Sequence, residues 1–250
     1  MKFDLHIHSC LSPCASLDMA PADIVRRACE AGMGGIALTD HNSAMNAPAF
    51  ARRARAAGLN CLFGLEIQTS EEVHTLALFD TVEQALDMTD WVYDAMPKRV
   101  NDPDTFGDQP ILSADSDDDE IANLEWRILA MGCRRTIPEA SAQTHRLGGI
   151  YIAAHIDRPN FSTIATLGDI PAAPDGSRFF DAIELSRTAD EALWLPRAAG
   201  YAVTRSSDAH NLDDVARVWT EADIPEFSVS ALKAAFAARA THPSARLTRF

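Results

Sequence analysis

Long apolar runs, basic side chains and paired cysteines are all scarce in this sequence of 250 residues. No apolar run approaches the roughly 20 residues that cross a bilayer, so we expect no membrane partner. The first residues hold no apolar stretch of the signal-peptide type, and the five cysteines form an odd set without the spacing of a disulfide framework. We therefore expect the protein to work in the reducing cytoplasm.

Basic residues are few, because 22 lysines and arginines stand against 36 aspartates and glutamates, for a formal net charge of −14. A surface that binds a nucleic-acid backbone is expected to be basic, so we expect no polymeric nucleic acid as a partner. A small-molecule phosphorylated substrate is compatible with this charge, because bound cations would invert the local field. The sequence does not predict the oligomeric state.

The apolar residues predict seven β-strands, most of them followed by a helical pattern. The strand-like runs cover 2–6, 35–39, 61–66, 73–79, 150–154, 181–185 and 202–206, and the helical patterns cover 21–31, 47–57, 82–95, 120–131, 138–147 and 189–199. This alternation predicts a mostly parallel α/β sheet or a closed barrel, and the length suits one domain. The region of about 96–135 interrupts the pattern, and we expect an insertion of loop and helix there.

One connection is too short for the parallel pattern. Only six residues separate Glu66 from Val73, whereas a parallel crossover needs a dozen or more. We therefore expect a hairpin that turns near Ser70 and places Glu66 opposite His74.

Six of the eight histidines lie in short motifs at the ends of predicted strands, and each motif adds an acid or a second histidine. The motifs are Asp4-Leu5-His6-Ile7-His8, Thr39-Asp40-His41-Asn42, Glu66 with His74, Ala154-His155-Ile156-Asp157 and Ser207-Asp208-Ala209-His210. Residues two apart in a strand point to one side, so two such histidines can converge on one ion. Imidazole and carboxylate together are ligands of Zn, Mn and Fe, and the motifs predict a multinuclear metal site in which Glu66 bridges two cations.

Residues beside these motifs are further candidates. The thiolate of Cys14 could complete a metal site, or Cys14 could be a packed loop residue, and both interpretations stay open. Asp40 could orient the neighbouring histidine or, like Asp157, assist proton transfer as a catalytic residue. Arg158 and Arg187 follow strand ends, where a guanidinium group could grip the phosphate of a substrate.

The motifs DLHIHS, TDHN, GLEI with VHTLALF, AHIDRP and SSDAHN resemble, in this order from residue 4 to residue 211, those of the PHP (polymerase and histidinol phosphatase) family. The resemblance implies a distorted (β/α)7 TIM-like barrel, with 1–250 as a single domain and two to three divalent metal ions (Zn, Mn or Fe) at its C-terminal face. Members often supply a further His or Asp shortly after the first motif, and here the nearest candidate is Cys14. Carried over by position, the implied metal ligands are His6, His8, His41, Glu66, His74, His155, Asp208 and His210.

The resemblance is to the free-standing metal-dependent phosphoesterases of the family, because no polymerase sequence accompanies the motifs. We expect hydrolysis of a small-molecule phosphoester, either a phosphomonoester or a nucleotide-like substrate, by a metal-bridging hydroxide. Two alternatives stay open. One is hydrolysis of a C–N bond, as in amidohydrolases, and the other is a non-catalytic metal-binding regulatory module.

Overall fold

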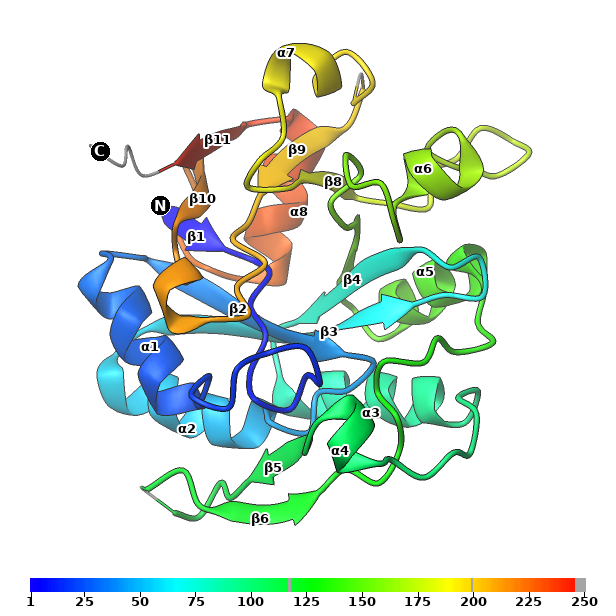
Figure 1. Cartoon of the computed structure of the whole chain (residues 1–250). Coiled ribbons are helices and arrows are strands. Elements are labelled where there is room, and N and C mark those ends of the chain that lie inside the picture. Colours follow the sequence, from blue (N-terminus) through cyan, green and yellow to red (C-terminus); the bar gives the residue numbers. More distant parts are fainter. Residues whose placement is uncertain (117, 199, 246–250) are drawn as a thin grey trace.

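A nine-stranded sheet, curled into a nearly closed barrel, forms the centre of the computed structural model, which describes residues 1–116, 118–198 and 200–245 (Figure 1). Residues 246–250 of the expected single domain lie outside the described residues. The strand order is β11-β10-β1-β2-β3-β4-β7-β8-β9. The strands are β1 (Lys2–Asp4), β2 (Gly35–His41), β3 (Asn60–Gln68), β4 (His74–Phe79), β7 (Ile150–Ala153), β8 (Ala182–Leu185), β9 (Ala202–Arg205), β10 (Val218–Ala222) and β11 (Thr241–Ala245).

Helices cover the outside of this barrel, and the predicted α/β barrel of a single domain is confirmed. All seven predicted strand runs fall on strands of the sheet. The longer helices are α1 (Pro21–Glu30), α2 (Ala47–Ala57), α3 (Val82–Tyr93), α5 (Ile137–Arg146) and α8 (Val229–Ala238), and the short ones are α4 (Pro103–Phe106), α6 (Thr163–Leu167), α7 (Glu191–Trp194) and the 3-10 turn η1 (Leu212–Asp214). No helix in the described part of the chain is both long enough and apolar enough to span a bilayer.

The β3–β4 hairpin distorts the barrel. Strands β1, β2 and β3 are parallel, as are β7, β8 and β9, whereas β4 is antiparallel to both of its neighbours. The hairpin is confirmed, but its register pairs Gln68 with His74 and Glu66 with Leu76. The shift of two residues keeps Glu66 and His74 on the same face of the sheet, because side chains alternate with period two.

One apolar cluster fills the barrel. It draws residues from α8 and from the seven strands β1, β2, β3, β4, β7, β8 and β9. It includes Phe3, Ala37, Leu62, Leu76, Ile152, Ala182 and Ala202. Residues of the opposite strand face, such as Ile36 and Phe63, pack with the outer helices in a second cluster. Because these strands are covered on both faces, several of their segments are nearly continuous runs of apolar residues in the sequence.

The barrel closes along a seam at which β1 and β10 meet β9. Beyond the strand ends, Ile7 forms a parallel bridge with Ala209, and the backbone N–H of His8 donates to the carbonyl of Ala209 at 3.0 Å. Lower in the barrel, β10 lies beside β9, and the Thr220 hydroxyl bonds the backbone N–H and carbonyl of Arg205 at 2.9 and 3.0 Å. The seam therefore brings the two terminal histidine motifs together.

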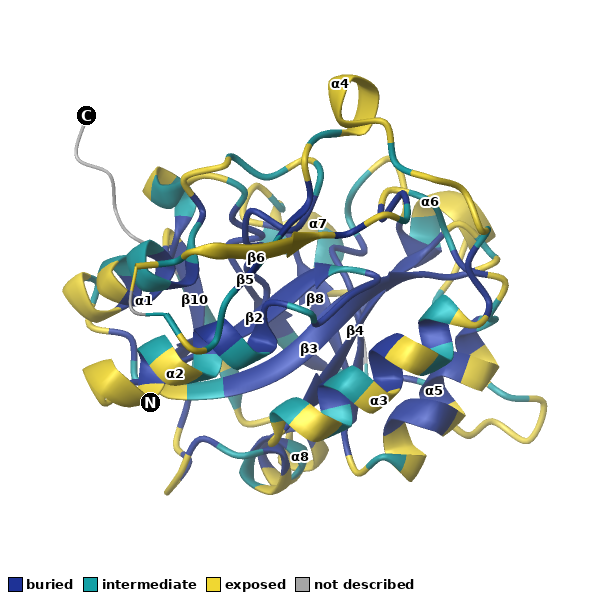
Figure 2. Ribbon diagram, turned by 90° about the horizontal axis from the view of Figure 1, so that it is seen from below, coloured by how far each residue is buried: buried dark blue, intermediate teal, exposed yellow. Residues whose placement is uncertain are grey.

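The insertion contains α4 and a small hairpin of β5 (Pro110–Leu112) and β6 (Ile121–Leu124), and Figure 2 shows β6 and α4 exposed. The helix predicted over 120–131 is wrong. The Gln109 side chain bonds the carbonyls of Glu125 and Arg127 at 3.0 and 2.5 Å and the N–H of Leu129 at 2.8 Å. One side chain thus satisfies backbone groups that a helix would have paired internally.

Candidate metal centre

The carboxylate of Glu66 lies at the middle of a buried cluster on the C-terminal side of the barrel. Its Oε1 lies 2.9 Å from His74 Nδ1, 3.0 Å from His155 Nε2 and 3.4 Å from His6 Nε2. Its Oε2 lies 3.0 Å from His41 Nδ1 and 3.4 Å from His8 Nε2. One carboxylate therefore contacts five imidazoles.

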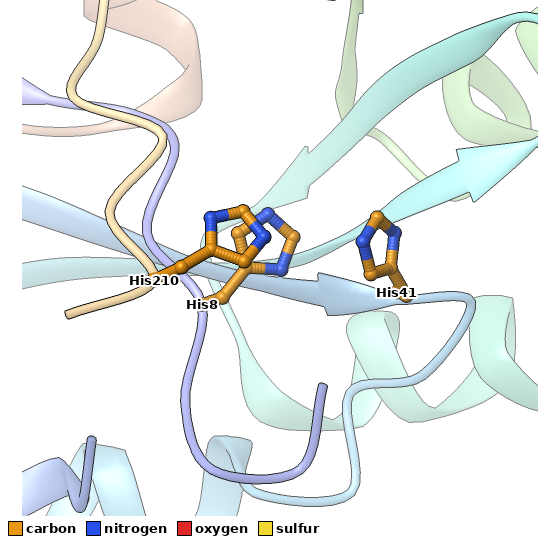
Figure 3. A group of neighbouring side chains, drawn as sticks. All are labelled: His8, His41 and His210. Carbon is orange, nitrogen blue, oxygen red and sulfur yellow. The ribbon is translucent and has the colours of Figure 1, made fainter. Parts of the chain in front are cut away.

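Asp208 and His210 complete this cluster from beyond β9. Asp208 Oδ1 lies 3.4 Å from His6 Nε2 and 3.3 Å from His8 Nε2. The rings of His8 and His210 stack with centroids 4.2 Å apart, and that of His41 at the end of β2 lies 4.6 Å from His8 (Figure 3). The structure thus brings together all eight residues for which the sequence motifs predicted a ligand role.

Strand alternation explains why the polar residues meet. His41, Glu66 and His74 follow the same faces as Ala37, Leu62 and Leu76, which fill the barrel below them. On these strands the residues that face the interior are apolar in the body of the barrel and polar at its C-terminal end. The cluster occupies the end of the barrel at which α/β barrels carry their active sites.

The hydrogen bonds of His6 set the position of its proton. Its Nδ1 lies 2.9 Å from Oε1 of Glu184, a buried carboxylate on β8. An ionised carboxylate only accepts, so Nδ1 donates to Glu184, and Nε2 is the ring nitrogen directed into the cluster, with a lone pair when the ring is neutral. The sequence analysis did not identify Glu184. Its one signal was a charged residue between the apolar residues Ile183 and Leu185 of a predicted strand.

A longer chain of hydrogen bonds does the same for His8. The Ser12 hydroxyl donates to Asp40 Oδ1 at 2.7 Å, which commits its only proton. Ser12 Oγ must then accept from His8 Nδ1, at 2.9 Å, and from the backbone N–H of His41, at 3.1 Å. His8 Nε2 therefore also presents a lone pair, 3.1 Å from His6 Nε2. His210 follows the same rule, since its Nδ1 lies 2.9 Å from the Asp208 carbonyl oxygen.

This donor set fits divalent cations. Three groups have ligand atoms within 4.8 Å of one another: His6, His8 and Asp208; His41, Glu66 and His74; and His8, His41 and His210. A tetrahedral ion with bonds of about 2.1 Å needs ligand atoms about 3.4 Å apart. The contacts within the first group measure 3.1, 3.3 and 3.4 Å. Nitrogen and oxygen ligand atoms at this spacing can bind one cation between them.

The electrostatics of the cluster also favour positive charge. Burial opposes ionisation of His6, yet Asp208, Glu184 and Glu66 together raise its pKa well above the usual value. Without a cation, His6 Nε2 therefore carries a second proton, and a metal ion would take the place of that proton. Burial would likewise raise the pKa of Glu66, but His74 and other imidazoles hold it well below its usual range. Buried carboxylates of this kind require compensating positive charge.

Backbone conformation at the cluster is unusual. His155 has φ +26° and Asp208 has φ +48°, in the left-handed region that L-residues rarely adopt. The Nδ1 of His155 is buried and has no partner among the described residues. Strain of this kind is typical of functional sites, at a cost of about 1–3 kcal/mol per residue.

The two acids predicted to be catalytic do not face the cluster. Asp40 is buried and accepts from the N–H and hydroxyl of Ser9, both at 2.7 Å, as well as from Ser12. Asp157 accepts from the N–H and hydroxyl of Ser186 at 2.7 and 2.6 Å. These contacts give no support to a role in proton transfer, and they favour a positioning role for Asp40.

The predicted phosphate ligands, Arg158 and Arg187, and the candidate ligand Cys14 differ in whether they contact residues of the cluster. Arg158 forms an ion pair with Oδ2 of Asp208, whereas Arg187 pairs with Asp214 at 2.5 Å. Burial raises the pKa of the Cys14 thiol, but hydrogen bonds with His210 and His41 lower it to about 6. Cys14 belongs to none of the three groups above, so its role as a ligand stays a prediction.

This chain is similar to known proteins in both sequence and structure. The model of the PHP domain matches 4–114, and that of the PHP-associated region matches 190–241. No curated protein matches the sequence significantly. Similar solved structures include the lesion-specific endonuclease PfuEndoQ from Pyrococcus furiosus, with a TM-score of 0.67, 17% identity and coverage of 95% of this chain and 56% of that one.

Two further structures are similar. Endonuclease Q with a 27-mer duplex and an abasic lesion at its active site has a TM-score of 0.64 and 16% identity over 94% of this chain and 55% of that one. A protein of Bifidobacterium adolescentis described as a metal-dependent phosphoesterase has a TM-score of 0.57 and 20% identity over 83% and 87% of the two chains. The present chain thus spans little more than half the length of the endonuclease chains.

These structures correct one expectation. The net charge of −14 led us to expect no polymeric nucleic acid as a partner, and that expectation is wrong, because endonuclease Q, which has a similar fold, holds a DNA duplex at its active site. The physical reason is that net charge averages the whole surface, whereas cations bound in a cleft decide the local field.

Proposed function

We propose that this chain, which belongs to the PHP domain family, is a hydrolase that cleaves phosphoesters with two or three divalent cations. The observation that carries the proposal is the Glu66 carboxylate shared by five imidazoles. Two of these imidazoles, His6 and His8, already direct Nε2 into the cluster, because Glu184 and Ser12 engage their Nδ1 atoms. Such a site has its proton positions arranged before a cation arrives.

The three groups of ligand atoms assign the residues. His6, His8 and Asp208 would hold one ion, and His41, Glu66 and His74 a second, with Glu66 between them and His155 adjoining. The third group, which adds His210, lies beside Cys14 and would hold a further ion. Bound Zn, Mn or Fe supplies Lewis acidity, which polarises phosphoryl oxygens and lowers the pKa of water.

The residues around these ligands hold them in place. Glu184 fixes His6, and the chain from Asp40 through Ser12 fixes His8, so neither ring needs to turn when substrate binds. Arg158 holds the outer oxygen of Asp208 and remains partly exposed at the rim. Its free N–H groups are suited to a phosphoryl oxygen, which makes it the stronger of the two predicted phosphate ligands.

The substrate carries a phosphomonoester or phosphodiester accessible to this cluster. Both small phosphorylated molecules and nucleic acids are candidates, the latter because the same fold serves endonuclease Q. The two classes differ in their leaving group and size, and not in the phosphoryl chemistry that the cluster would perform.

The test is phosphate or alcohol release by protein reconstituted with Mn, Zn or Fe, on phosphomonoesters, phosphodiesters, and single- and double-stranded DNA and RNA. We expect release that depends on the metal and is lost in His8→Ala. The matched control is His145→Ala, because His145 pairs with Asp181 outside the cluster. Stoichiometric metal with no release from any ester would overturn the proposal. Turnover of amides instead would support the amidohydrolase alternative, and binding without any turnover the regulatory one.

A further inference from the structure

A pocket of about 410 Å³ opens directly beside the metal ligands His41 and His74. Its volume is within the range of small-molecule sites. Two phenylalanines line it, Phe106 from the end of α4 and Phe161 from the loop after β7. Both are unusually accessible for their size, with 38% and 41% of their surface exposed. The pocket is therefore continuous with the cluster but aromatic in character.

Phe161 is held in place at two points. Its ring stacks on that of His74, with centroids 4.6 Å apart and planes 8° from parallel. Its carbonyl accepts the backbone N–H of His74 at 2.8 Å. Its φ is +56°, which is a marked outlier for a bulky side chain. An exposed aromatic ring kept in a strained conformation beside a metal ligand points to a function for that ring.

The charge of the lining restricts what the pocket can hold. Among the described residues that line it, none is a lysine or an arginine, and the titratable groups are Cys14, His41 and His74 at the end that faces the cluster. A second phosphate would find no cation there. A flat, uncharged ring would find aromatic faces, on which stacking is favourable.

We propose that this pocket receives a planar aromatic ring that the substrate carries next to its scissile phosphate, stacked against Phe161. The inference rests on the proposed phosphoester hydrolysis and names the substrate class for that site. Phe161 is then a specificity-determining residue. Esters with an aromatic ring near the phosphate are preferred to saturated esters of the same size.

The test compares benzyl phosphate with cyclohexylmethyl phosphate. Both esters release a primary alcohol, so their leaving groups are nearly equal in basicity and the ratio of kcat/KM reports recognition of the ring. We expect the metal-loaded protein to prefer the benzyl ester about threefold to tenfold. In Phe161→Gly the ratio should fall to about one. Glycine accepts a positive φ without strain, so this variant keeps the fold, and Phe161→Asn provides a second such replacement.

Binding separates this inference from the proposed function. Benzylphosphonate and cyclohexylmethylphosphonate have no ester bond to cleave, and calorimetry measures their affinities directly. If neither ester is hydrolysed but benzylphosphonate binds more tightly, and loses this advantage in Phe161→Gly, the pocket assignment stands while the hydrolase proposal fails. Hydrolysis without preference, or a preference that survives in both Phe161 variants, would overturn the inference. The control Trp126→Leu removes an exposed ring that does not line the pocket and should preserve the ratio.

Discussion

Asp40 at the end of β2 and Asp157 beyond β7 are held by the same arrangement of groups on two sides of the barrel. Each carboxylate accepts the backbone N–H and the hydroxyl of one serine, Ser9 or Ser186, at 2.6 to 2.7 Å. Among the described residues, Asp40 alone of the two accepts a third bond, from Ser12, which is itself bonded to His8. The hydroxyl of Ser186 instead adjoins Thr188. The β1–β2 side thus uses the arrangement to orient His8, a predicted metal ligand, and the β7–β8 side uses it to hold a loop.

The largest difference between the two sides should appear on removing the carboxylates. Asp40→Ala leaves three buried donors unpaired, so we expect a loss of about 3 kcal/mol or more in the free energy of unfolding. Metal affinity should fall as well, about tenfold to a hundredfold. Asp157→Ala, which removes a partly exposed group, should cost about 1 kcal/mol and leave metal affinity unchanged. Urea denaturation and competition with a chelator measure the two effects, and equal losses in both variants would break the comparison.

The serines sharpen the same comparison. Ser12→Ala removes the acceptor for His8 Nδ1, so the ring is free to turn and to change its tautomer. We expect metal affinity to fall about tenfold, with a smaller effect on unfolding. Ser186→Ala is the matched control, since its hydroxyl contacts no imidazole among the described residues. A similar fall in affinity in the control would show that the effect does not pass through His8.

Two arginines on the β7–β8 side, Arg158 and Arg187, can be compared as predicted phosphate ligands. Arg158→Met removes the guanidinium group that pairs with Asp208, and we expect kcat/KM on a phosphoester to fall about tenfold. Arg187→Met removes a group whose partner is Asp214, and the expected change is within about twofold. Steady-state kinetics with a saturating metal concentration decide between them. The reverse order would make Arg187 the phosphate ligand.

The smallest expected effect is a difference in the rate at which two thiols, Cys14 and Cys61, are alkylated. In the metal-free protein, the pKa of Cys14 is lowered to about 6, so above that pH the thiolate predominates, whereas burial raises the pKa of Cys61 to about 11. We expect iodoacetamide to modify Cys14 at pH 7 and Cys61 only at strongly alkaline pH. Peptide mass spectrometry follows both sites. Metal should protect Cys14 if it is a ligand, and unchanged labelling with metal bound would remove it from the ligand set.

The sequence predicted the fold well where one segment determines its own structure. The barrel strands are buried on both faces and therefore appear as apolar runs, and the ligand motifs are compact because each sits at one strand end. The helix expected over 120–131 failed because a side chain elsewhere, Gln109, satisfies that backbone. Local patterns cannot indicate such a distant partner.

The residues that support the ligands were missed for the same reason. Glu184 contacts His6 across 178 positions of sequence, and nothing near either residue indicates the pairing. Ser12 lies only four residues from His8, but its role depends on Asp40, which the fold brings beside it. The sequence thus indicated which residues lie together in the cluster, whereas the hydrogen bonds that orient His6 and His8 required the structure.

The seam between the first and last barrel strands bears on how the protein is made. During translation, Asp208 follows His8 by 200 positions. At about 5–20 residues per second, the early histidines wait about 10 to 40 seconds for that partner. A nascent chain therefore has no complete first metal group until the seam can form. Metal binding by these predicted ligands would therefore require the closed barrel, and it would stabilise that state by mass action.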